Sequence, residues 1–185
     1  LTSSDGTHKI SFSPDKKHYL AEWSRVDHPP VSEVRRTSDG ELIAALNEPD
    51  LAPLLAAGWQ KPERFVAKDR NGKHDIHGVI LRPTNFEKGK KYPIINFVYG
   101  EPWGQTAQDN WSGSRHLWHW LMTQHGFIVA TVDNRGTRAP RGRAWRRSLY
   151  GAVGVLGSRD QSDALKAMQQ EWMGRHTQLW QAMLG

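Results

Sequence analysis

The sequence predicts an α/β fold preceded by an N-terminal all-β part. In residues 1–46, short segments of alternating apolar and polar residues are separated by tight-turn sequences, as in an antiparallel meander. Further along, nearly continuous apolar runs alternate with helical segments, which is typical of a parallel sheet covered on both faces. The composition changes near residue 47, so we predict one domain over residues 1–46 and a second over 47–185.

The all-β part is predicted to be a meander of two hairpins. The letters SPDK at residues 13–16 and SDG at residues 38–40 are turn sequences, and DHPP at residues 27–30 breaks the chain between the hairpins. The phrase FSPDKK is common in β-propeller blades, and four strands make one blade, so we expect the last blade of a larger propeller. The expected strands are 8–12, 18–24, 31–36 and 41–46.

The second part begins with a short helix, followed by a hairpin. Gly58 ends the helix, and the Asn-Gly pair within residues 70–73 is a strong hairpin turn. Apolar strands and helices then alternate, and Gly126 ends the longer of two helices. The expected helices are 50–57, 114–125 and 158–170, and the expected strands are 62–69, 74–81, 94–99 and 127–132.

Composition narrows the class of protein. Apolar residues make up 37% and charged residues 24% of the 185 residues, as in folded globular proteins. The apolar runs are far shorter than the roughly 20 residues of a membrane-spanning helix, and the polar opening residues do not resemble a secretory signal. The absence of cysteine excludes disulfides, thiolate metal sites and a cysteine nucleophile.

The net charge of +6 and the nine tryptophans raise the question of an anionic partner. The densest basic stretch, residues 135–147, carries six arginines around one tryptophan. We interpret it as a solvated loop and helix face, because no nucleic-acid-binding fold signature accompanies it, and we expect no nucleic-acid partner. A basic, tryptophan-rich binding module for an anionic or carbohydrate partner stays open as the alternative function.

Several motifs are candidates for functional sites. His116 and His119 share one helix face, as a zinc site could use, but no third ligand is near in sequence; His74 and His77 are expected in a strand, on opposite faces. The DNRGT sequence at residues 133–137 follows an apolar strand and is interpreted as a tight turn bonded to neighbouring loops. No P-loop and no G-x-G-x-x-G is present, and no cofactor or metal is expected.

Serine hydrolase chemistry requires a G-x-S-x-G turn followed by an acid and a histidine. No such pentapeptide exists in the sequence. By its own residues, therefore, the chain has no complete catalytic machinery.

Five phrases nevertheless occur in the order and spacing of a known family: SFSPDKKHYLAEWS, VDHPPVSEVRRTSDGELI, FVAKDRNGKHDIHGVILRP, KKYPIINFVYGEPWGQ and GFIVATVDNRGT. Over residues 1–170 the chain resembles the prolyl oligopeptidase family of serine peptidases, in particular its dipeptidyl peptidase IV branch. The resemblance implies a β-propeller blade followed by the first half of an α/β-hydrolase domain, in a family that releases dipeptides from peptide substrates. It also suggests a periplasmic or secreted location.

The resemblance carries one site residue over to this chain. Tyr99, within VYGEP, matches the family tyrosine whose hydroxyl donates to the oxyanion hole. The DNRGT sequence and Asp160-Gln161 match parts of the family scaffold. The triad serine, acid and histidine have no counterpart here, and residues 171–185 form an atypical tail. We therefore expect a fragment that is inactive alone, with an unpaired sheet edge open to self-association or to a partner chain.

Overall fold

The computed structural model describes residues 5–169, which form two compact units. The first unit comprises residues up to Lys61 together with Asp109–Ser114, and the second comprises Pro62–Gln108 and the residues from Arg115 onward. The domain boundary that the composition suggests near residue 47 stays a prediction. The tail at residues 171–185 lies outside the described residues.

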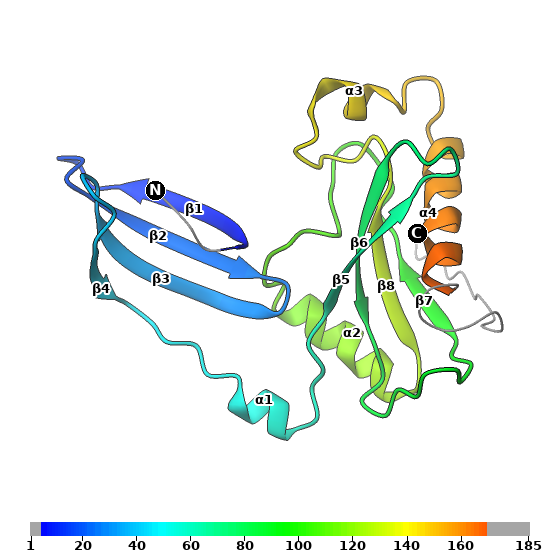
Figure 1. The fold of residues 1–185 in the computed structure, drawn as a ribbon, viewed down its shortest axis with the longest axis horizontal. Coiled ribbons are helices and arrows are strands. Elements are labelled where there is room, and N and C mark those ends of the chain that lie inside the picture. The colour runs from blue at the N-terminus through cyan, green and yellow to red at the C-terminus, as the bar shows by residue number, and fades with distance from the viewer. Residues whose placement is uncertain (1–4, 170–185) are drawn as a thin grey trace. The chain divides into compact units, whose positions relative to one another are not determined.

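The first unit contains a four-stranded antiparallel meander, as the sequence predicts (Figure 1). Neighbours along the chain are neighbours in the sheet, in the order β1-β2-β3-β4. Trp59 and Trp111 pack against each other in the same unit, with ring centroids 5.7 Å apart. The strands are β1 (Thr7–Phe12), β2 (His18–Arg25), β3 (His28–Arg36) and β4 (Leu42–Ala45), and the short helix α1 (Ala52–Ala56) follows them.

The predicted break at residues 27–30 is wrong, because β3 already begins at His28. Pro29 and Pro30 are tolerated inside this strand for a local reason. The pairing of β2 with β3 is irregular between Trp23 and Arg25, and β4 pairs with β3 only from Glu33 onward. The prolines, which lack an N–H group, therefore lie where the ladder is already interrupted or absent.

The second unit is built on a mixed four-stranded sheet in the order β5-β6-β8-β7. The predicted parallel sheet is confirmed only for β7 and β8, whereas the pairs β5–β6 and β6–β8 are antiparallel. Continuous apolar runs report burial on both faces and not strand direction, and the tight turn between β5 and β6 imposes an antiparallel pair. The strands are β5 (Glu63–Lys68), β6 (Asp75–Leu81), β7 (Ile94–Phe97) and β8 (Ile128–Asp133).

Helices contact both faces of this sheet. In β7, Asn96 bonds Gln161 of α4 on one face, while Phe97 packs against His119 of α2 on the other, since successive strand residues point to opposite faces. The helices α3 (Gly142–Arg147) and α4 (Val155–Met168) belong to the second unit, as does α2 (Ser114–Gln124) from Arg115 onward. Helix α4 begins three residues before its predicted start at 158.

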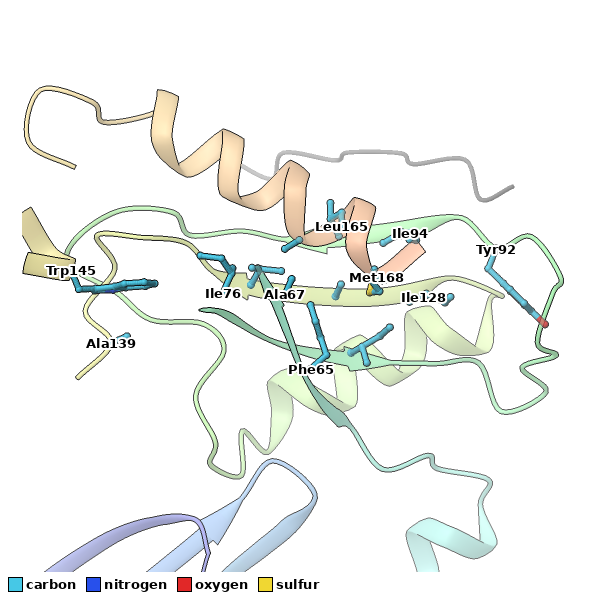
Figure 2. Packing of buried hydrophobic residues seen from close by; sticks show 14 residues of the cluster. Phe65, Ala67, Ile76, Tyr92, Ile94, Ile128, Ala139, Trp145, Leu165 and Met168 are labelled. Carbon is cyan, nitrogen blue, oxygen red and sulfur yellow. The ribbon is translucent and has the colours of Figure 1, made fainter. Parts of the chain in front are cut away.

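The main core lies between the sheet and α4. Figure 2 shows Leu165 and Met168 of α4 over Ile94 and Ile128, and all four are almost fully buried. Burial of side chains of this size stabilises the folded state by about 1.5–3 kcal/mol each. This packing fixes the C-terminal part of α4 over the residues where β7 and β8 begin.

Strand β7 ends at Phe97 and not at residue 99 as predicted. Its parallel pairing with β8 stops at Phe97, and Gly100 then takes a left-handed conformation with φ of +76°. Tyr99 therefore lies in the turn beyond the strand, so a regular strand end cannot be what holds it.

Among residues 5–169, no helix has the length and the apolar character that crossing a bilayer requires.

Candidate functional site

A cavity of about 320 Å³ lies in the second unit, where β7 ends. The carboxyl end of parallel strands is where open α/β sheets place their ligands. Its walls come from two segments of the chain. The first supplies Asn96, Val98, Tyr99, Gly100 and Glu101, and the second supplies Gly154, Gly157, Ser158, Gln161 and Ser162.

Tyr99, the one site residue predicted by the resemblance, lines this cavity. Its side chain is half exposed, with 47% of its surface accessible. The ring packs on the backbone of Gly104, where an added Cβ would lie 2.5 Å from the ring carbon Cε1. The phenol thus lies against a glycine that no larger residue could replace without moving it.

The last residue of β8 and the residues that follow it hold the turn that carries Tyr99. Asp133 accepts hydrogen bonds from the backbone N–H of Thr106 at 2.8 Å and from its hydroxyl at 3.3 Å. Burial raises the pKa of Asp133, against the opposing effect of these hydrogen bonds. The backbone N–H of Arg138 donates to the carbonyl of Gly104 at 3.0 Å. The predicted role of residues 133–137 as a turn bonded to neighbouring loops is borne out at Asp133.

Arg135 behaves differently from the prediction, because its side chain bonds two carboxylates and not the backbone of a loop. Its guanidinium approaches Asp160 at 2.7 Å and Asp69 at 3.2 Å, and both carboxylates are completely buried. Asp160 belongs to α4, whereas Asp69 belongs to the turn between β5 and β6. One cation therefore joins three segments of the chain.

Asp69, one of the two carboxyl groups that Arg135 contacts, has a clearly lowered pKa. Burial alone would raise its pKa, but hydrogen bonds from the His74 ring and from the backbone N–H groups of His74 and Lys73, with the charge of Arg135, hold the pKa of Asp69 at about 2. The His74 ring thus stabilises the ionised form of the buried Asp69 carboxylate. The strand is predicted to begin at 74, but β6 begins at Asp75, so His74 lies just before the strand, whereas His77 is exposed within it.

His116 and His119 share one face of α2, as predicted, with ring centroids 6.2 Å apart. Both rings are buried. Within the described part of the chain, both ring nitrogens of His119 and Nδ1 of His116 are buried without a hydrogen-bond partner. Burial, together with the charge of Arg115, lowers the pKa of each ring to about 4. Residues 5–169 contain no group of three or more metal-ligating side chains.

Helix α2 presents its large apolar side chains outward. Leu117, Trp118 and Leu121 are 41–54% exposed, although the same helix buries two histidines and Thr123.

The basic stretch is mainly a solvated surface. Five of its six arginines are exposed, and Arg141 stacks over the Trp145 ring, 4.0 Å from the ring centroid. Trp145 itself is buried and donates from Nε1 to the carbonyl of Thr137 at 3.2 Å. Trp145, the tryptophan of the basic stretch, thus stabilises the turn after β8.

Sequence reasoning missed the side chains that connect the cavity walls. Asn134, Gln161 and Asn96 form buried amide hydrogen bonds, and Asp69 pairs with Arg135. Asn134 and Gln161 stand within segments that the resemblance identified as scaffold, and that was the available signal. Nothing in the sequence around Asp69 links it to Arg135.

Comparison with known sequences gives a consistent set of relatives. The sequence model of the Prolyl oligopeptidase family matches residues 111–180. A protein of Tuber melanosporum named as a dipeptidyl-aminopeptidase B is 30% identical over 166 residues, which are 89% of this chain and 18% of that protein. Mouse dipeptidyl peptidase 8 is 26% identical over 114 residues, which are 62% of this chain and 13% of that protein. The chain therefore spans less than a fifth of the length of these two relatives.

Solved structures show the same fold. Dipeptidyl peptidase 4 of Porphyromonas gingivalis aligns with a TM-score of 0.77 and 27% identity, over 95% of this chain and 25% of that one. A structure from Bacteroides ovatus described as a dipeptidyl aminopeptidase IV aligns with a TM-score of 0.80 and 24% identity, over 96% of this chain and 25% of that one.

Proposed function

Since the chain belongs to the prolyl oligopeptidase family and is dipeptidyl-peptidase-like, we propose that it is part of a serine-type dipeptidyl peptidase acting on peptides. Its antiparallel sheet would be a terminal propeller blade, and its mixed sheet the first half of an α/β-hydrolase domain. The observation that carries the proposal is the position of Tyr99, which lines a cavity at the carboxyl end of a parallel strand pair.

In this proposal, the Tyr99 hydroxyl donates a hydrogen bond to the oxyanion that develops on the scissile carbonyl. A donor of this kind typically lowers the barrier by about 3–4 kcal/mol, provided that it is already in position before the reaction. The packing of the ring on Gly104 supports such preorganisation.

The nucleophile would come from outside the 185 residues, since their sequence contains no G-x-S-x-G turn. We expect the purified chain to show no hydrolysis of an alanyl-prolyl p-nitroanilide substrate above a buffer blank, and no labelling by a fluorophosphonate probe for reactive serines. Turnover by this chain that is lost on Tyr99→Phe would contradict the proposed division of the site.

The positive test is a chimera in which residues 62–168 replace the matching segment of the Porphyromonas gingivalis relative. The chimera is expected to hydrolyse the dipeptide substrate, and Tyr99→Phe in it is expected to lower kcat by about 100–1,000-fold with little change in KM. Tyr150→Phe is the matched control, because Tyr150 is 95% exposed and does not line the cavity. An active chimera whose kcat is unaffected by Tyr99→Phe would refute the role of Tyr99.

A further inference from the structure

The turn that carries Tyr99 needs support that β7 does not provide. The strand ends at Phe97, and the tyrosine is half exposed two residues later. An oxyanion donor displaced by about 1 Å can lose on the order of 100-fold in rate. The question is which side chain fixes this turn relative to the rest of the cavity.

Asn134 is fully buried and makes three hydrogen bonds with its carboxamide. Its Nδ2 group donates to the carbonyl of Gly100 at 3.1 Å and to the carbonyl of Arg135 at 2.9 Å. Its Oδ1 atom accepts from Nε2 of Gln161 at 3.0 Å. Gly100 is the residue after Tyr99, so this amide bonds directly to the turn in question.

Gln161 extends the connection into α4 and β7. Its Nε2 also donates to the carbonyl of Val132 at 2.8 Å, and its Oε1 accepts from Nδ2 of Asn96 at 3.1 Å. Backbone carbonyls only accept hydrogen bonds, so the carbonyl partners fix which end of each amide is the donor. The orientation of Asn134 towards Gly100 is therefore determined by its surroundings.

The backbone is adapted to this contact on both sides. Gly100, whose carbonyl accepts this bond, is itself in a left-handed conformation, with φ of +76°. On α4, a Cβ added to Gly157 would lie 3.1 Å from Nδ2 of Asn134 and 3.6 Å from the Gly100 carbonyl oxygen. A glycine at this helix position lets α4 approach the amide closely.

We propose that Asn134 is a positioning residue for Tyr99, holding the carbonyl of the adjacent Gly100 against α4 through Gln161. This inference rests on the proposed function for its catalytic meaning, but the contact itself is independent of catalysis. Removal of the carboxamide takes the Asn134 donor from the Gly100 carbonyl, and it takes one of its two acceptors from Nε2 of Gln161. The turn with Tyr99 then loses one of its constraints, while the bonds from Arg138 to Gly104 and from Thr106 to Asp133 remain.

The test uses 19F NMR of the whole 185-residue chain labelled with 3-fluorotyrosine. The chain has four tyrosines, so four resonances are expected, and each is assigned by a Tyr→Phe substitution. Tyr19 and Tyr92 are buried and Tyr150 is 95% exposed, so the other three report on the two cores and on solvent. Asn134→Ala is expected to move the Tyr99 resonance towards that of Tyr150 and to leave the Tyr19 and Tyr92 resonances in place.

Three further variants separate positioning from general stability. Asn134→Asp keeps an acceptor for Gln161 but places a carboxylate against the Gly100 carbonyl, so it should move the same single resonance. Asn47→Ala removes an amide that bonds Ser32 and Pro30 in the other unit, and it should leave Tyr99 unchanged. Leu165→Ala weakens the core of the same unit, and should lower the urea midpoint without moving the Tyr99 resonance.

A Tyr99 resonance that is unchanged in both folded Asn134 variants overturns the proposal. So does a joint shift of all four resonances to the unfolded position in both variants, because Asn134 would then be a residue of general stability. Since this readout involves no hydrolysis, its result is distinct from that of the chimera: loss of the Tyr99 role there would leave the contact between Asn134 and the turn standing.

Discussion

At the scale of single residues, the buried charges at the turn after β8 are neutralised by ion pairs within the protein. Arg135 stands between two buried carboxylates, and its own side chain is only 11% exposed. A buried ion pair contributes little net stability, but loss of one partner leaves an uncompensated buried charge. Arg135 therefore adds little net stability, but its removal would leave two buried carboxylates without their shared cation.

We predict that Arg135→Met lowers the free energy of unfolding by about 3–5 kcal/mol, because Asp160 and Asp69 lose their shared cation. Urea denaturation followed by tryptophan fluorescence measures the change. Arg146→Met is the matched control, since Arg146 is exposed on α3, and it should change the value by less than about 0.5 kcal/mol. Equal effects of the two variants would show that the buried carboxylates do not depend on Arg135.

The two buried histidines predict a loss of stability in mild acid. Their pKa is about 4 in the folded chain and 6.5 when exposed, so the unfolded state binds more protons between these values. Stability conferred by the neutral rings is complete above about pH 6.5 and falls as the pH drops towards 4, by up to about 3 kcal/mol per histidine.

His119→Phe should flatten this pH dependence, as measured by urea midpoints from pH 7 to pH 4.5, because phenylalanine can pack on Phe97 and cannot be protonated. His125→Gln, at an exposed position after α2, should leave the dependence as it is. Retention of the full acid effect in His119→Phe would assign it to other groups.

At the scale of elements, the turn after β8 is shaped by a glycine as well as by its polar side chains. Gly136 has φ of +90°, and an added Cβ would lie 2.0 Å from Cγ of Leu149. The glycine thus combines a left-handed backbone with close contact to the segment after α3. Gly151 shares the conformation, with φ of +71°, but an added Cβ would meet nothing within 4 Å.

This contrast gives a matched prediction. Gly151→Ala should cost about 1 kcal/mol of folding free energy, for the left-handed backbone alone. Gly136→Ala should cost at least about 2 kcal/mol more, because Leu149 must also move. Thermal or urea unfolding of both variants measures the difference, and similar losses at the two positions would mean that the loop around Leu149 yields freely.

The elements also show what a sequence can predict. Hairpin turns with Asn-Gly or Asp-Gly pairs and helices ended by glycine were located well, because these signals are local. The end of β7, the direction of the β6–β8 pair and the prolines inside β3 were not, since each depends on which strand lies alongside. The same holds for the site residues. Tyr99 could be predicted from a family phrase, whereas the ion pair of Arg135 with Asp69 joins residues distant in the sequence and could not be predicted without the fold.

At the scale of the whole chain, exposed apolar surface and a sheet edge favour association. Within residues 5–169, β7 pairs only with β8, and Leu117, Trp118 and Leu121 of α2 are exposed. A strand edge with free backbone groups can pair with another chain.

We therefore expect the purified chain to associate with itself, with a sedimentation coefficient that rises with protein concentration at low and at high salt. Persistence at high salt would indicate apolar and backbone contacts, whereas loss at high salt would indicate the basic surface. A monodisperse monomer at every concentration would contradict the expectation.

The six residues 133–138 hold the turn with Tyr99, helix α4 and the β5–β6 hairpin at once, through Asp133, Asn134, Arg135 and Arg138. If the turn with Tyr99 alone is grafted onto another scaffold, we expect a poorly ordered loop, because these hydrogen bonds are missing there. Residues 133–138 and the turn with Tyr99 therefore depend on each other structurally. Exchange of only one of the two segments between distant relatives is expected to leave the turn without its hydrogen bonds.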